Sequence, residues 1–153
     1  MTTRSGGEAS VPPPLPGPHL ADTTVWSKVR SYPGLTAWFN TEVRASRIWT
    51  CEVVALELLR SARNTGAFTT QSELLAALPS CSVDRAGWVR ARRVQQLLAA
   101  DGMHRGVRPA DLLIAVAAES AGVPVLHYDR DYDLIARVSG QPTRWLLPAG
   151  SLP

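Results

Sequence analysis

The chain has 153 residues, of which 45% are hydrophobic, so its size is that of one globular domain with a buried core. Its net charge is +3, and all but one of its sixteen basic residues are arginine, a balance that favours a phosphate-bearing partner. The two cysteines lack Cys-x-x-Cys spacing and the three histidines are scattered, which argues against a zinc or thiol site. The sequence has no leader-like start and no apolar run of about 20 residues, which argues against secretion and membrane insertion. We therefore expect a cytoplasmic protein.

The first half of the chain predicts a short N-terminal extension followed by alternating strands and helices. Residues 1–18 are rich in Pro, Gly, Ser and Thr and lack apolar periodicity, so we predict a disordered extension, with the domain over residues 19–150. Residues 19–21 are a short strand, 33–46 have helical apolar spacing, 47–50 are a strand, and 51–63 are a helix that is apolar except for Glu57.

The second half has stronger start and stop signals. Thr70 and Glu73 have capping-box spacing and predict a helix start there. A helix over 84–100 is predicted to turn Trp88, Val94, Leu97 and Leu98 inward and to stop at Gly102, and a helix from Pro109 is predicted to stop at Gly122. Residues 123–127 are a buried strand, 131–139 a helix ended by Gly140, and 144–147 a last strand.

Strands that alternate with helices predict an α/β sandwich with a mainly parallel sheet, in which functional sites gather beyond the carboxyl ends of the strands. Four acids stand at places where a carboxylate is unfavourable: after the first strand (Asp22), inside an apolar helix (Glu57), in the first turn of another (Asp111), and after the buried strand (Asp129). Carboxylates brought together in this way need a cation, hydrogen-bond donors or raised pKa values.

Each of these acids also has an ordinary structural explanation. Asp22 is suited to capping the next helix, and Asp111 to favouring a helix dipole. Glu57 has Arg60 and Ser61 about one turn further along as partners. Asp131 and Asp133 fit the N-cap and the first turn of the helix that follows them. Together, however, three of the four acids fall at junctions that an α/β fold collects at one edge of its sheet, which favours a shared site.

In order and spacing, "ADTTVW", "VVALELLRSAR", "RPADLLIAVAAESAGVPVLHYDRDYDLIA" and "SGQPTRWLLPAG" resemble the PIN-domain ribonucleases, and in particular the VapC toxins of bacterial toxin–antitoxin pairs. The resemblance covers roughly residues 19–150. It implies a PIN-like three-layer sandwich whose mainly parallel central sheet is flanked by helices. It also implies a metal-dependent endoribonuclease that hydrolyses RNA phosphodiester bonds and is the toxin of such a pair.

The resemblance further implies roles for individual residues. Asp22, Glu57, Asp111 and Asp129 match the catalytic acids that hold Mg²⁺ or Mn²⁺, and Asp131 is expected to lie at the same metal site. Thr23 matches the small hydroxyl residue after the first acid, and Arg105, Arg108 and Arg130, close to these acids in sequence, are expected to contact substrate phosphates. The implied partners are RNA, a VapB-like antitoxin and a second copy of the chain.

One alternative of another class remains open at this stage, namely a PIN-like binding or scaffold module that has lost turnover. A retained acidic set argues against it, because carboxylates without a metal repel each other. An EF-hand is excluded, because Leu134 stands where its loop needs Gly and Gly140 where it needs Glu.

Overall fold

The computed structural model describes residues 10–153, and its centre is a five-stranded sheet in which every pair of neighbouring strands is parallel. The strand order is β3-β2-β1-β4-β5. The strands are short: β1 (His19–Ala21), β2 (Ile48–Cys51), β3 (Ser80–Cys81), β4 (Val125–His127) and β5 (Thr143–Trp145). Leu20, Ile48 and Val125 are fully buried, so the middle strands form the centre of the core. The predicted parallel α/β architecture is therefore confirmed.

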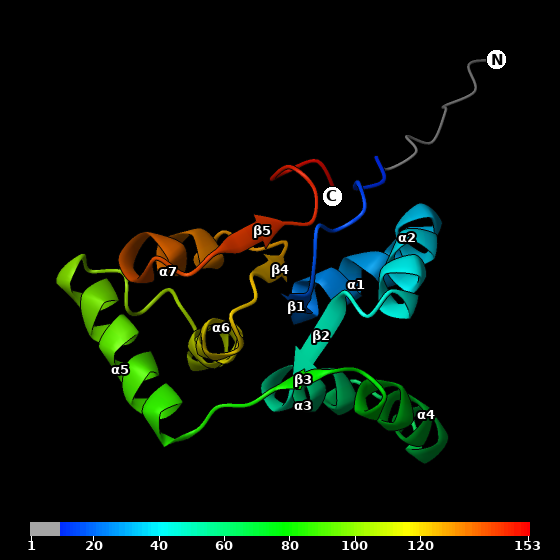
Figure 1. The fold of residues 1–153 in the computed structure, drawn as a ribbon, viewed down its shortest axis with the longest axis horizontal. Coiled ribbons are helices and arrows are strands. Elements are labelled where there is room, and N and C mark those ends of the chain that lie inside the picture. Colours follow the sequence, from blue (N-terminus) through cyan, green and yellow to red (C-terminus); the bar gives the residue numbers. More distant parts are fainter. Residues whose placement is uncertain (1–9) are drawn as a thin grey trace.

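Seven helices connect and cover these strands (Figure 1). The helices α1 (Thr23–Ser31) and α2 (Pro33–Arg44) pack against each other, and so do α3 (Glu52–Arg60) and α4 (Thr65–Ala76). On the other side of the sheet in Figure 1, α6 (Pro109–Ala121) contacts β1, β3 and β4, and α5 (Arg85–Ala100) and α7 (Asp131–Ser139) pack against it. None of the helices described over residues 10–153 is long and apolar enough to cross a membrane.

The best-predicted part of the fold is the segment from Pro109 to Gly140. Pro109 lies at the start of α6, where its fixed φ suits the first helical turn. Gly122 and Gly140 end α6 and α7 in the left-handed conformation, with φ values of 69° and 76°. That conformation is unfavourable for residues with a Cβ, so these two glycines are reliable stop signals.

Several sequence predictions differ from the structure. Residues 23–31, for which no element was predicted, form α1, with Asp22 as its N-cap. The β-branched residues of this segment have weak helix propensity, so its sequence gives no clear helical signal. The capping-box prediction at Thr70 and Glu73 is wrong, since α4 begins at Thr65 with the Asn64 side chain accepting from the N–H of Ala67. The two-residue strand β3 carries no detectable pattern and was not predicted.

Two side-chain predictions on α5 and α7 are also wrong. Trp88 is 57% exposed rather than inward, because the buried face of α5 is formed by Gly87, Ala91, Val94 and Leu98. Asp131 is the first residue of α7 rather than its N-cap. Arg130 occupies the N-cap position, and the carboxylate of Asp129 accepts from the N–H of Asp131 at 2.9 Å.

The predicted disordered extension falls partly on residues 1–9, which lie outside the described residues. Residues 10–18 instead pack against the domain. Leu15 is only 5% exposed, and its N–H donates to the buried carboxylate of Glu42. The indole N–H of Trp38 donates to the carbonyl of Pro13. The segment therefore lies on α2 as an irregular, proline-rich strap, and its sequence accordingly lacks the periodicity of a helix or a strand.

Candidate metal centre

Three carboxylates meet where the chain passes from β4 into α7. Oxygen atoms of Asp111, Asp129 and Asp131 all lie within 4.8 Å of one another. Asp111 comes from the first turn of α6, Asp129 from just past β4, and Asp131 from the first turn of α7. The strand end and two helix starts therefore bring together three acids that are up to 20 positions apart in sequence (131 − 111).

Burial and like charge make this arrangement unfavourable when it is fully ionised. Burial, together with the nearby charges of Asp22 and Asp129, raises the pKa of Asp111 to about 6, against the opposing effect of Arg108. Burial and the charge of Asp129 also raise the pKa of Asp131. A divalent cation between these oxygens would remove both penalties.

Asp22 stands next to this cluster, and both of its carboxylate oxygens already have donors. It follows β1, which pairs in parallel with β4, so Asp22 and Asp129 lie at the same edge of the sheet. One oxygen accepts from the hydroxyl of Tyr132 at 2.8 Å. The other accepts from the backbone N–H and the hydroxyl of Thr24 at 3.1 and 2.6 Å. Asp22 therefore caps α1 and also lies next to the acidic cluster, as predicted from the sequence.

Glu57 joins the site through two neighbours. Its carboxylate accepts from the hydroxyl of Thr23 at 2.8 Å and lies 3.8 Å from the guanidinium of Arg108. The same guanidinium donates to Asp111 at 3.0 Å. Arg108 thus bridges Glu57 and Asp111. A cavity of about 370 Å³ lined by Thr23, Glu57, Arg108 and neighbouring residues opens beside them. The partners considered from the sequence, Arg60 and Ser61, do not bind the carboxylate of Glu57.

The predicted site residues thus fall into three groups. Asp111, Asp129 and Asp131 form the cluster. Arg108 pairs with Asp111 and with Glu57, which accepts from Thr23, and Asp22 lies beside the cluster at the end of β1, where its charge acts on Asp111. Arg105 and Arg130 are exposed, and within residues 10–153 neither forms an ion pair.

Three supporting residues were missed by sequence reasoning. The hydroxyl of Thr24 donates to Asp22 and accepts from the N–H of Tyr128, which ties β1 to the end of β4. Tyr132 is fully buried with its hydroxyl on Asp22. Burial lowers the pKa of His127, and the Nδ1 atom of its ring accepts from the N–H of Asp129 at 3.2 Å. The available signals were a second hydroxyl residue after Asp22 and a tyrosine directly after Asp131.

Comparisons with known proteins show the family to which the chain belongs. The PIN domain family matches residues 20–138. Ribonuclease VapC18 of Mycobacterium tuberculosis is 38% identical over 86% of this chain and 96% of its own length. Ribonuclease VapC51 of the same organism is 37% identical over 88% of this chain and 96% of its own length.

Solved structures share the fold. The DNA-bound VapBC structure from Salmonella typhimurium contains a chain that superposes with a TM-score of 0.66 at 20% identity, covering 86% of this chain and 99% of that chain. A chain of VapBC-1 from nontypeable Haemophilus influenzae gives 0.66 at 13% identity, over 84% of this chain and 97% of that chain. On the strength of the family match and the two full-length relatives, this chain belongs to the PIN-domain family and, within it, to the VapC ribonucleases.

Proposed function

We propose that this protein is a metal-dependent endoribonuclease and the toxin of a toxin–antitoxin pair, and that Asp111, Asp129 and Asp131 hold its Mg²⁺ or Mn²⁺. The observation that carries the proposal is the convergence of three carboxylates within 4.8 Å, one of them fully buried with a pKa raised to about 6. An all-oxygen donor set is the one that these hard cations prefer. The full-length relatives named as ribonucleases support the reaction class.

The bound cation would supply a water of lowered pKa and charge stabilisation for the departing oxygen of the phosphodiester. The protein's own residues would hold the cation and orient the RNA. Asp22 and Glu57 complete the acidic set, with Tyr132 and Thr23 fixing their carboxylates through hydroxyl donors. Arg108 is placed to contact a phosphate at this site, because its side chain is 58% exposed while its guanidinium is held beside Asp111.

The proposed partners follow from the same relatives. A ribonuclease acting freely would damage its own cell, so we propose a VapB-like antitoxin that covers the acidic site, and a second copy of this chain in the assembled toxin. The antitoxin is supported by several similar solved structures that are of VapBC systems, and the second copy is what the resemblance to the VapC toxins implies. Arg105 and Arg130, both exposed and close in sequence to the acids, are the further proposed phosphate contacts.

Cleavage of RNA by the purified chain tests the proposal. We expect single-stranded RNA to be cut with Mg²⁺ or Mn²⁺ and left intact in EDTA. Asp129→Asn should nearly abolish cleavage and Asp131→Asn should weaken it. Asp133→Asn is the matched control, because Asp133 is exposed in the same turn and bonds to Trp145 instead of the cluster. Its rate should stay within a factor of a few.

Absence of metal-dependent cleavage would instead support the alternative of a PIN-like module without turnover. Equal loss of activity in Asp129→Asn and Asp133→Asn would show that the metal centre has been assigned to the wrong carboxylates.

A further inference from the structure

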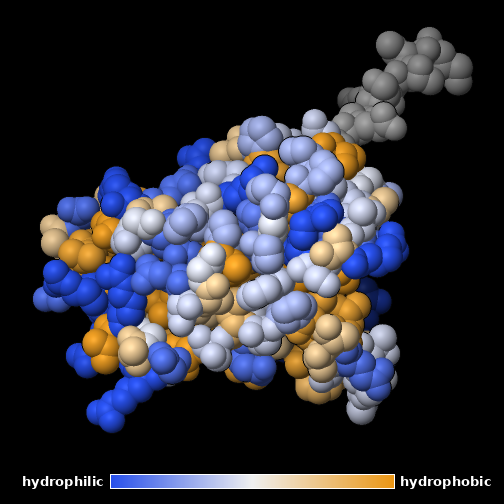
Figure 2. Space-filling model, viewed as in Figure 1, coloured by the Kyte–Doolittle hydropathy of each residue, from blue (hydrophilic) through white to orange (hydrophobic). Residues whose placement is uncertain are grey.

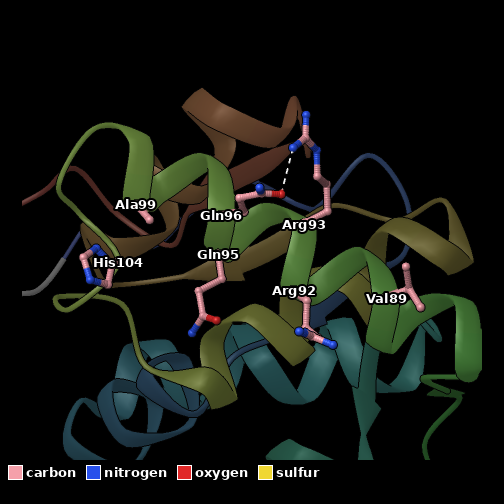
Figure 3. Close-up of a pocket in the computed structure, with 7 residues that line it drawn as sticks. All are labelled: Val89, Arg92, Arg93, Gln95, Gln96, Ala99 and His104. Atoms are coloured by element: carbon pink, nitrogen blue, oxygen red, sulfur yellow. Dashed lines mark hydrogen bonds between the residues drawn. The ribbon is translucent and has the colours of Figure 1, made fainter.

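The exposed side of α5 carries an open groove outside the acidic site. Its volume is about 660 Å³, and it is lined by Val89, Arg92, Arg93, Gln95, Gln96, Ala99 and His104. Figure 3 shows the lining side chains of α5, with Arg93 donating to Gln96, and His104 on the segment that follows the helix, at the end of the groove near Ala99. Every charged or amide side chain in the lining is able to donate hydrogen bonds to a phosphate or a base.

The groove is basic, and no acid in its lining neutralises it. All four charged residues within α5 are arginines: Arg85, Arg90, Arg92 and Arg93. Within residues 10–153, Arg90 pairs with Glu119, while Arg85, Arg92 and Arg93 form no ion pair. The acids that flank the helix are otherwise engaged, since Asp84 caps α5 and Asp101 lies 3.8 Å from Arg137. Unpaired arginines in a row favour a polyanion.

An aromatic residue interrupts the basic row. Val89, 65% exposed, lies at the end of the groove opposite to His104, and Trp88, 57% exposed, lines an adjoining depression. In Figure 2, hydrophobic and strongly hydrophilic residues alternate over the region that α5 occupies in Figure 1. Exposed aromatic side chains beside arginines are the arrangement on which unpaired bases stack while phosphates are neutralised.

The groove continues toward the acidic site. A second depression shares Arg92 and Gln95 with it and extends over Trp88 to Pro109 and Leu113 on α6. Pro109 directly follows Arg108, whose guanidinium lies between Glu57 and Asp111. The two depressions together reach from His104 along α5 to the start of α6, next to Arg108 of the acidic site.

We propose that the strip defined by Trp88, Arg92, Arg93, Gln95 and His104 binds the single-stranded part of the RNA substrate outside the scissile phosphate. The inference rests on the proposed ribonuclease function and adds to it where the flanking nucleotides lie. A second copy of the chain is the less suitable occupant, because a twofold interface would place this arginine row close to its own copy.

The first test measures RNA affinity without cleavage. The unmodified chain is titrated in EDTA with a fluorescein-labelled single-stranded RNA of about 16 nucleotides, at several salt concentrations. The Arg92→Gln/Arg93→Gln variant should bind at least tenfold more weakly, and the slope of log K against log salt should decrease in magnitude by about 1.4. The control is Arg30→Gln/Arg44→Gln, which removes the same charge from exposed positions on α1 and α2. The control should retain most of the affinity.

The second test uses Trp88 as a reporter. Trp26 and Trp38 are buried and Trp49 and Trp145 are half-buried, so Trp88 is the exposed tryptophan among the described residues. The same RNA should quench tryptophan fluorescence, and Trp88→Phe should remove most of that quenching. Base stacking is worth about 1–3 kcal/mol by alanine substitution, so Trp88→Ala should weaken binding by about fivefold or more.

The third test separates this inference from the proposed function. With Mg²⁺, the Arg92→Gln/Arg93→Gln variant should cleave the RNA with a raised KM and a kcat within a factor of a few of the parent. If the unmodified chain cleaves RNA and this variant matches it in affinity, salt slope and KM, the groove is not the RNA path and the ribonuclease function stands. If the variant keeps its RNA affinity but alters the sedimentation of the chain, the groove is a self-association surface and the inference is overturned.

Discussion

Asp111 is a fully buried carboxylate whose ionised form is unfavourable in the metal-free protein. Its folded-state pKa of about 6 is above the ordinary value of 3.8, so the folded chain takes up a proton there as pH falls through 6. This group therefore makes the folded state relatively more stable at low pH, and that stability is lost as pH rises through about 6. The loss is the free-energy cost that a bound cation would remove.

Asp111→Asn should reveal the free-energy cost of the ionised Asp111 carboxylate in the metal-free protein. In EDTA at pH 7.5 we expect the variant to be at least as stable as the parent, because the amide carries no charge. By pH 4.5, the difference in free energy of unfolding should move in favour of the parent by about 2 kcal/mol. Urea unfolding of both chains at several pH values measures it. A difference that does not change with pH would show that burial does not penalise the charge of Asp111.

Tyr132 is the buried partner of Asp22, and its hydroxyl is its one polar contact to the site. Tyr132→Phe leaves a buried carboxylate oxygen without this donor, which should cost about 1–3 kcal/mol in free energy of unfolding and lower cleavage. Tyr128→Phe is the control, because over residues 10–153 the hydroxyl of Tyr128 bonds to the C-terminal segment alone, including the N–H of Leu152. Denaturant unfolding that ranked Tyr128→Phe as the more damaging change would contradict this assignment.

The sequence pointed to acids that the structure brings to one edge of the sheet, but not to the contacts that hold these acids in place. Asp22, Glu57, Asp111 and Asp129 were recognisable because each interrupts an apolar segment or follows a strand. The hydroxyl of Tyr132 reaches Asp22 across 110 positions, and the guanidinium of Arg108 reaches Glu57 across 51 positions (108 − 57). Contacts at such separations depend on the packing of whole elements, which no local pattern encodes.

At the scale of elements, the strap over residues 10–18 is the largest departure from the expectation. Its prolines suppress both periodicities on which element prediction depends, so the sequence alone resembles a disordered segment. Tertiary contacts nevertheless hold the segment on α2, because the N–H of Leu15 donates to Glu42 and the carbonyl of Pro13 accepts from the indole N–H of Trp38. The same reliance on tertiary contacts explains why β3, with two residues, was missed, whereas α6 and α7, with local proline and glycine signals, were predicted well.

Leu15→Ala tests whether the strap stabilises the domain. Leu15 is 5% exposed, so truncation to alanine should cost about 2 kcal/mol or more in free energy of unfolding. Val11→Ala is the control in the same strap, since Val11 is 55% exposed and should change stability by less than about 0.5 kcal/mol. Thermal or urea unfolding measures both. Equal stabilities for Leu15→Ala and the parent would mean that residues 10–18 do not pack on α2 in solution.

For the molecule as a whole, the order of the parallel strands and the positions of the helices place the acidic centre and the basic strip of α5 close together. The carboxyl ends of β1 and β4 deliver Asp22 and Asp129 to one edge of the sheet, and α6 supplies Asp111 beside them. Helix α5 packs against the outer side of the same α6, and this packing places the basic strip close to the acidic centre. The two surfaces have opposite charge, which suits a metal ion at one and a polyanion at the other.

Calorimetric titration with Mn²⁺ tests most directly whether Asp111, Asp129 and Asp131 hold a divalent cation. The chain, stripped of metal with EDTA and then freed of the chelator, should bind Mn²⁺ with saturation. Asp129→Asn should bind Mn²⁺ at least tenfold more weakly, while Asp133→Asn, four residues further along and inside α7, should keep the affinity of the unmodified chain. No saturable binding by the unmodified chain, or equal losses in the two variants, would contradict this assignment of the cation.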